Sequence, residues 1–237
     1  MKEIEKKQSK TIKNNHEELQ ERSEKQVIEN RINTSASPKF WQFGNTIYSD
    51  SRIILRKVED EDMQSFLALQ YEYTLIPFMF KDERFKQYLW EEHIKDVSIA
   101  YSIIDSVTKV YMGYCGIKNI SLPQWEISME LQKSQTGKGI GYLALGHFLN
   151  AVKERSGVSE FRVRIDSDNY ASQKLVEKLG AVPNGISEFL LHDEEDILKC
   201  EEDNLNCIDE KLIAVAKKFG VEPRKLISHV LEYKLIL

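Results

Sequence analysis

The segment that most constrains the fold of this chain lies between residues 125 and 149. In one-letter code it reads WEISMELQKSQTGKGIGYLALGHFL. Its first part alternates in polarity, which is typical of a strand with one face formed by Glu126, Ser128 and Glu130 and an apolar face opposite. Three glycines at alternate positions follow, and then an apolar run of helical character. This order predicts a strand, a glycine-rich turn and a helix.

A strand, a glycine loop and a helix in this order can bind an anion. Gly137, Gly139 and Gly141 let backbone N–H groups approach a phosphate, and the helix N-terminus adds its partial positive charge. The loop is not a P-loop, and Tyr142 stands where a dinucleotide-binding fingerprint has its third glycine. We therefore expect a phosphate-binding loop. A tight turn that lets the helix pack closely is the alternative explanation for the glycines.

Composition limits the class of protein. The 237 residues suffice for one domain plus extra segments, and the net charge of −5 gives no reason to expect nucleic acid as a partner. No apolar run approaches the roughly 18 residues of a membrane span, and the N-terminus lacks an apolar leader, so no membrane partner is expected. The three cysteines are irregularly spaced and match no zinc pattern. They predict a reducing, cytoplasmic location and no metal site.

The chain divides into three parts by its residue pattern. Residues 1–37 are rich in charged and amide side chains and predict an arm that is either helical or disordered. A helix that packs on a partner subunit is the other interpretation, so a homodimer stays open. Residues 38–237 predict one domain with an acidic and helical insertion at about 192–227. Within it, residues 193–210 carry nine acids against one lysine, and a final strand is expected at 229–237.

The remaining elements follow from periodicity and from turn residues. The expected strands are 53–58, 98–104, 109–117, 126–131, 161–165 and 188–191. The expected helices are 59–69, 82–95, 142–155, 171–179 and 209–219. Strands and helices therefore mix along one chain, which indicates an α/β domain.

Three motifs resemble those of the GNAT acyl-CoA N-acyltransferases, especially the Rim-type ribosomal-protein N-terminal acetyltransferases. The first is the strand that begins at Arg52 and leads into an acidic helix. The second is the strand and glycine loop at 126–141, and the third comprises 168–172 and 176–181. The resemblance covers residues 52–191. It implies an α/β GNAT fold with a mixed, largely antiparallel sheet of about six to seven strands flanked by helices, here with an N-terminal helical extension.

The resemblance also implies acetyl-CoA as the co-substrate. The pyrophosphate is expected on the glycine loop and the pantetheine arm along the strand before it. The expected cofactor-binding residues are Met129, Glu130, Leu131, Thr136, Gly137, Lys138, Gly139, Ile140, Gly141, Asn169 and Ser172. An ordinary role at a helix N-terminus is the alternative for the last two. Many family members have Gln or Arg where this chain has Thr136.

Transfer to an amine needs a proton acceptor, because amines titrate near about 10.4 and arrive protonated. Glu126 matches the acidic residue of the family's strand and is the expected catalytic base. A solvated strand carboxylate is its alternative role. Glu130 lies on the same face and is also a candidate for positioning the amine. The general acid is unassigned, because Val176 stands where many relatives have a tyrosine.

The sequence therefore predicts an acetyl-CoA-dependent N-acetyltransferase that moves an acetyl group to a primary amine by direct transfer in a ternary complex. The acceptor is left open between a protein N-terminus, a polyamine, an aminoglycoside and another small amine. The acidic segment favours a cationic acceptor. The alternative, suggested by Val176, is a non-catalytic acyl-CoA-binding or sensor module of the same fold.

Overall fold

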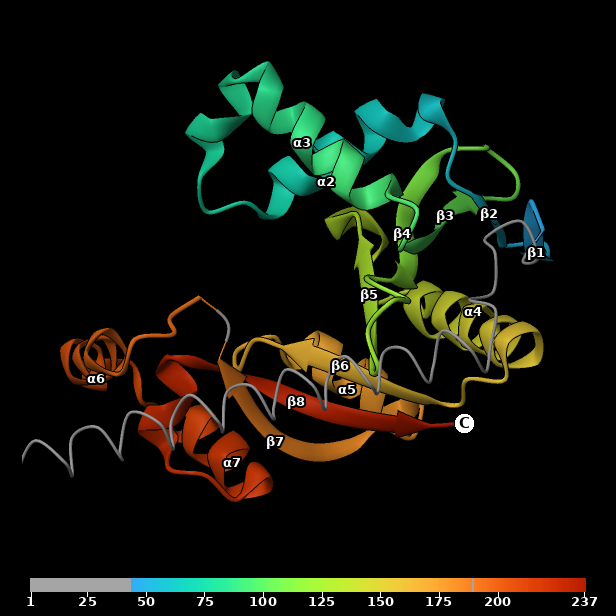
Figure 1. Cartoon of the computed structure of the whole chain (residues 1–237). Coiled ribbons are helices and arrows are strands. Elements are labelled where there is room, and N and C mark those ends of the chain that lie inside the picture. The colour runs from blue at the N-terminus through green and yellow to red at the C-terminus, as the bar shows by residue number, and fades with distance from the viewer. Residues whose placement is uncertain (1–43, 189) are drawn as a thin grey trace, which may run out of the picture. The chain divides into compact units, whose positions relative to one another are not determined.

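The computed structural model describes residues 44–188 and 190–237, and the predicted arm at residues 1–37 lies outside them. The described strands form one eight-stranded sheet in the order β1-β2-β3-β4-β5-β6-β8-β7 (Figure 1). They are β1 (Thr46–Ser49), β2 (Ile53–Lys57), β3 (Ile99–Asp105), β4 (Tyr111–Ile117), β5 (Trp125–Leu131), β6 (Glu160–Ile165), β7 (Val182–Glu188) and β8 (His229–Ile236). Among the described strands, only β5 and β6 pair in parallel. The predicted mixed, largely antiparallel sheet is confirmed.

Six described α-helices accompany the sheet. They are α2 (Met63–Tyr73), α3 (Glu83–Ile94), α4 (Ile140–Ser156), α5 (Tyr170–Lys178), α6 (Glu194–Asp203) and α7 (Glu210–Phe219). Short 3-10 turns are η2 (Asp60–Asp62), η3 (Pro77–Lys81), η4 (Lys133–Gln135), η5 (Leu205–Cys207) and η6 (Pro223–Ile227). Asp82, Asp193 and Asp209 cap the starts of α3, α6 and α7 with their side chains, and glycines in the left-handed region end α4 and α7. No helix in the described ranges is long and apolar enough to cross a bilayer.

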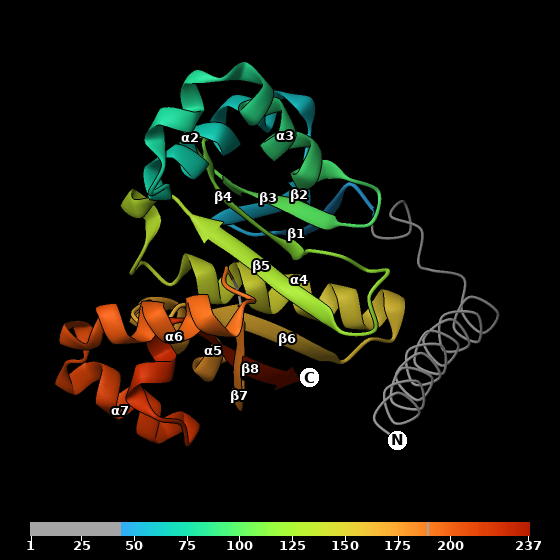
Figure 2. The ribbon, with the colours of Figure 1, turned by 60° about the vertical axis from the view of Figure 1, so that its left-hand side comes forward.

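Two hydrophobic cores lie on opposite sides of β4. The smaller core joins Phe66 of α2 and Trp90 of α3 to Tyr114 of β4. The larger core contains Cys115, the next residue of β4, together with side chains of α4, α5 and α7. Figures 1 and 2 show α2 and α3 together on one side of the first four strands and α4 on the other. Because side chains alternate along a strand, β4 divides the two cores.

The strand β5 parts from β6 soon after it begins. It pairs with β4 over residues 127–131, whereas its described pairing with β6 covers only Trp125 and Glu126. The apolar side chains at Ile127, Met129 and Leu131 contact the larger core, as the predicted alternation requires. Glu126, Ser128 and Glu130 therefore lie on the side of α2. The sheet thus separates into two halves, strands β1 to β5 and strands β6, β8 and β7. The acidic face of β5 lies where these two halves diverge.

The backbone N–H and C=O groups of β5 also alternate in direction from one residue to the next. The amide of Lys118 donates to the carbonyl of Glu126 across a distance of 2.9 Å, so that residue turns its backbone groups toward β4. Backbone groups point to opposite sides at successive residues of a strand. Met129 and Leu131 therefore turn their N–H and C=O groups away from β4, to the side on which β6 has diverged.

Two strands differ from the sequence-based expectation. The strand expected at 188–191 lies earlier, as β7, and includes Pro183 and Gly185, two residues that are depleted in strands. An edge strand tolerates them, and β7 is the last strand of the sheet. The short strand β1, which no sequence pattern indicated, adds one strand at the other edge. The helices α6 and α7 lie between β7 and β8, where the insertion was expected.

Candidate active site

The glycine loop leads directly into α4. Gly137 and Gly139 have φ angles of 73° and 77°, in the left-handed region that favours glycine. A Cβ at either position would meet no described atom within 4 Å, so these glycines are needed for the backbone path and not for packing. Gly139 is the N-cap of α4 and gives the first turn no side-chain cap. N–H groups at such a helix start suit a phosphate.

The third glycine has a different role. A Cβ at Gly141 would lie 3.0 Å from the terminal methyl of Met129 and 3.3 Å from a methyl of Leu175. Glycine at this position therefore lets α4 pack closely on β5 and α5. The close-packing explanation offered by the sequence therefore applies to Gly141, and phosphate binding at Gly137 and Gly139 stays a prediction. The contact at Gly141 brings together three of the elements that were expected to hold the cofactor.

Two other residues of the loop make bonds within it. The Thr136 hydroxyl donates to the carbonyl of Lys133 across 2.8 Å, and the Lys138 ammonium donates to the Gln135 side chain across 3.2 Å. Both side chains are exposed. The Thr136 bond closes the turn before the glycines, so threonine supports the loop here without the longer side chain that many relatives have.

The helix α5 begins after Asn169 and packs its later part beside the start of α4. The Asn169 carbonyl oxygen accepts from the Ser172 amide across 3.1 Å, so Asn169 is the N-cap of α5. At the other end of α5, the Lys178 ammonium lies 4.3 Å from the centre of the Tyr142 ring on α4. The helix that carries Asn169 and Ser172 thus packs on the start of α4 through its last turns. The contact of these two residues with a cofactor stays a prediction.

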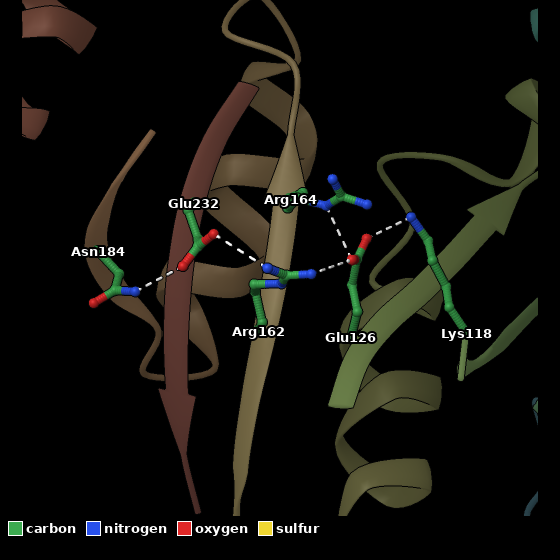
Figure 3. A network of polar contacts seen from close by, with 6 residues as sticks. All are labelled: Lys118, Glu126, Arg162, Arg164, Asn184 and Glu232. Atoms are coloured by element: carbon green, nitrogen blue, oxygen red, sulfur yellow. Dashed lines mark hydrogen bonds and ion pairs between the residues drawn. The ribbon is translucent and has the colours of Figure 1, made fainter. Parts of the chain in front are cut away.

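Glu126 is buried in a network of charges (Figure 3). Its side chain is 6% exposed and contacts three cations: Lys118 at 2.5 Å, Arg164 at 2.9 Å and Arg162 at 3.2 Å. Burial acts to raise the pKa of this carboxyl, but the neighbouring Lys118 and Arg164 outweigh it and hold the pKa below its usual value. Glu126 is therefore not a solvated carboxylate. Its contacts keep it ionised and make it a weak proton acceptor.

The network continues from β5 across β6, β8 and β7. Arg162 of β6 also lies 3.6 Å from Glu232 of β8, which accepts a hydrogen bond from the Asn184 amide of β7 across 2.8 Å (Figure 3). Three strands are thus joined on one face by charged pairs, and the Asn184 amide joins the fourth strand to them. This arrangement stabilises the sheet where β5 and β6 are still paired. The role of Glu126 as catalytic base stays a prediction.

Glu130 lies in a different environment on the same strand. Its carboxylate accepts from the Gln70 amide of α2 across 2.5 Å and from the Tyr114 hydroxyl of β4. Burial raises the pKa of Glu130 above its usual value, and these two hydrogen bonds oppose the rise only partly. Both partners are uncharged, so the carboxyl is held in place without being neutralised.

The end of α2 is tied to the end of β5. The Tyr73 hydroxyl donates to the Leu131 carbonyl across 2.8 Å, on the edge that faces away from β4. The Lys133 ammonium donates to the Glu72 carbonyl across 2.7 Å. These bonds fix α2 above the strand that was expected to hold the pantetheine arm. Val176 of α5 is 3% exposed and belongs to the larger core. Its buried aliphatic side chain does not supply the general acid.

The sequence analysis missed several residues of this region. Arg162 and Arg164 are visible as polar alternate positions of a strand, but their contact with Glu126 depends on the register between β5 and β6. Gln70 and Tyr73 carry no motif, and only the packing of α2 brings them to β5. Among the residues that the structure describes, no three metal-ligating side chains come together.

Known structures share this architecture at low sequence identity. A RimL ribosomal-protein alpha-N-acetyltransferase solved with coenzyme A is 14% identical, and the alignment covers 81% of this chain and 98% of that one with a TM-score of 0.56. A spermidine N-acetyltransferase from Vibrio cholerae, solved with CoA and spermine, is 15% identical, with 79% and 96% covered and a TM-score of 0.54. A ribosomal-protein-S5-alanine acetyltransferase from Vibrio fischeri is 15% identical, with 80% and 95% covered and a TM-score of 0.54. At such identities these likenesses show the fold.

Sequence comparison identifies the family. A search of curated proteins finds no match. The family model described as an acetyltransferase (GNAT) domain matches residues 52–182, which is more than half of the chain. The predicted family and fold are thereby confirmed. The protein belongs to the GNAT acetyltransferases and is an N-acetyltransferase that uses acetyl-CoA as its co-substrate.

Proposed function

We propose that the protein moves the acetyl group of acetyl-CoA to a primary amine by direct transfer in a ternary complex. The observation that carries this proposal is the divergence of β5 from β6 next to the glycine loop. The edge of β5 at Met129 and Leu131 offers backbone groups to the pantetheine amides, and the start of α4 offers N–H groups to the pyrophosphate. The acidic face of the same strand lies within reach of an incoming amine.

The cysteine near this strand supports direct transfer. Cys115 is paired with Met129 across β4 and β5, but its thiol points into the larger core and is fully buried. Burial raises the pKa of this thiol far above its usual value, which leaves little thiolate to attack a thioester. A covalent acetyl-cysteine intermediate at this position is therefore disfavoured.

The acceptor is proposed to be cationic. The structural neighbours named above act on a polyamine or on ribosomal proteins, and α6 begins with three acids in its first turn. One acid of this segment, Glu201, is instead buried and bonded to Lys225 and Ser228. The first-turn acids Glu194, Glu195 and Asp196 are exposed and can attract positive charge. Replacing the three first-turn acids by their amides should raise the acceptor KM at low salt, and an unchanged KM would remove this part of the proposal.

The test measures thiol release from acetyl-CoA with spermidine and with short peptides that begin with serine or alanine, and identifies the acetylated product by mass spectrometry. In double-reciprocal plots of initial velocity, intersecting lines are expected for direct transfer in a ternary complex, and parallel lines would contradict it. Tight binding of acetyl-CoA without thiol release for any amine would favour the non-catalytic sensor module instead.

A pair of glycine variants tests the cofactor loop. Gly139 and Gly157 lie at the two ends of α4, with φ angles of 77° and 74° and open space around each. Alanine at either position should cost about 1 kcal/mol of unfolding free energy, because a Cβ disfavours this conformation. Only Gly139→Ala is expected to weaken coenzyme A binding in calorimetry. Equal affinities of the two variants for coenzyme A would show that its phosphates do not bind at the start of α4.

A further inference from the structure

We propose that Glu130 takes the proton from the acceptor amine and that Gln70 and Tyr114 position its carboxylate for this step. The inference rests on the proposed transferase function and assigns its proton acceptor. Glu130 lies on β5 beyond the last residue that pairs with β6, and its side chain is partly exposed. It therefore projects from the acidic face at the point where the two halves of the sheet have separated.

The carboxylate is oriented by bonds from two different elements. The Gln70 amide of α2 reaches one carboxylate oxygen across 2.5 Å, and the Tyr114 hydroxyl of β4 also donates to the carboxyl. Tyr114 is buried in the smaller core, so it cannot follow the carboxylate if that group moves. A carboxylate accepts about four hydrogen bonds, so capacity remains for an ammonium group.

The charges around Glu130 favour proton transfer more than those around Glu126. Three cations contact Glu126 (Figure 3), whereas the hydrogen-bond partners of Glu130 are neutral. The titratable and polar groups that face Glu130 are Gln70 and Tyr73 of α2, Tyr111 and Tyr114 of β4, and the more distant Lys118. Lys118 is paired with Glu126. A carboxyl that is not neutralised by a cation accepts a proton more readily, which is what a general base requires.

The step balances as follows. The ammonium group of the acceptor gives one proton to the Glu130 carboxylate and becomes a neutral amine. Its nitrogen forms a bond to the thioester carbonyl carbon, and the C–S bond breaks with its electron pair on sulfur. The nitrogen's surplus proton passes to the thiolate of coenzyme A, and Glu130 returns its own proton to solvent. One amide, one thiol and one free proton result.

The test compares Glu130→Gln with Glu126→Gln, using spermidine and peptides that begin with serine or alanine. Glu130→Gln should lower kcat/KM by a factor of about 10² to 10⁴. Coenzyme A binding in calorimetry should be unchanged, because the substitution keeps the backbone of the strand that is expected to hold the cofactor. In the wild type, kcat/KM should fall as the pH drops through the Glu130 pKa, and this limb should vanish in Glu130→Gln. It should persist in Glu126→Gln, because Glu126 is not the group that titrates.

Gln70→Ala tests the positioning role. The Gln70 hydrogen bond favours the ionised carboxyl, so its loss should move the acidic limb of kcat/KM to higher pH. A structural role alone would lower activity without moving this limb. Turnover by Glu130→Gln with an unchanged rate and pH profile overturns the role of Glu130 while the transferase function stands. Absence of turnover by the wild type with every amine overturns both.

Discussion

The two ends of β5 carry the same residue type in opposite surroundings. At the first end the strand is paired with β6, and Glu126 is enclosed by Lys118, Arg162 and Arg164. At the second end the strand has left β6, and Glu130 accepts hydrogen bonds from the neutral side chains of Gln70 and Tyr114. The two carboxyls lie four residues apart on one face, yet their pKa values are shifted in opposite directions.

This difference separates the structural role of the first end of β5 from the chemical role proposed for the second end. Where β5 pairs with β6, Glu126 lies among three cations and balances their charge. This charge pairing matters because an unpaired buried charge is costly. Where β5 has left β6, Gln70 of α2 and Tyr114 of β4 supply neutral hydrogen bonds, so the carboxyl of Glu130 remains able to exchange a proton. The resemblance to the family pointed to Glu126, because sequence position does not reveal which carboxyl is already neutralised.

The strongest way to break the comparison is to remove the carboxyl at the paired end. Glu126→Ala leaves three cations without their shared anion and should cost about 3 to 5 kcal/mol of unfolding free energy, measured by urea denaturation. Glu130→Ala is the matched control on the same strand face and should lose clearly less. Equal losses would show that the two ends do not differ in structural importance.

A cation of the network should have an intermediate effect. The Arg164 side chain is 24% exposed and donates to Glu126 across 2.9 Å. Arg164→Met keeps the aliphatic stem but removes the charged bond, and we expect a loss of about 2 kcal/mol in the same denaturation experiment. A loss below about 0.5 kcal/mol would mean that the other two cations replace this one.

The third cation should matter least of the tested network partners. Lys118 is 48% exposed, although its contact with Glu126 is the shortest of the three. Exposed ion pairs contribute little because water screens them and a long side chain must be ordered, so Lys118→Met should cost less than about 1 kcal/mol. A larger loss than that of Arg164→Met would contradict this ranking by exposure.

The smallest effect is a difference in the pH dependence of stability. The lowered pKa of Glu126 adds stability above its unfolded value near 4.5, and this is lost as the pH falls through the folded pKa. The raised pKa of Glu130 has the opposite sign: its contribution is present below about 4.5 and is lost as the pH rises through the folded pKa. Unfolding free energies of Glu126→Gln and Glu130→Gln, measured between pH 3 and 8 and subtracted from the wild type, should therefore slope in opposite directions. Slopes of the same sign would contradict the assigned environments.

Local signals in the sequence were sufficient for much of the fold. Polarity alternation located β5, the glycines located the start of α4, and Asn169 marked the start of α5 as its N-cap. Each of these features depends on residues close together in the chain. The strand β7 was displaced in the sequence analysis because Pro183 and Gly185 weaken its pattern, and only its place at the edge of the sheet makes it tolerable.

The candidate site could be predicted only in part. The glycine loop is local, but the surroundings of the two carboxyls depend on long-range contacts. Arg162 and Arg164 are 36 and 38 residues from Glu126, and Gln70 is 60 residues from Glu130. Their positions follow from the register of β6 and from the packing of α2, which no periodicity encodes. The sequence could therefore name the carboxyls but not distinguish their protonation behaviour.

The divergence of β5 from β6 also makes a ladder of backbone hydrogen bonds that ends inside the molecule. At Met129 and Leu131 the strand faces the diverging side, as an edge strand would, but this edge is flanked by α2 and by α4. An extended pantetheine arm that bonds there acts as a short additional strand. Hydrogen exchange at the Met129 and Leu131 amides should then slow when acetyl-CoA binds, and the unfolding temperature should rise with its concentration. In the proposed binding mode, the binding of acetyl-CoA also completes this edge of the sheet.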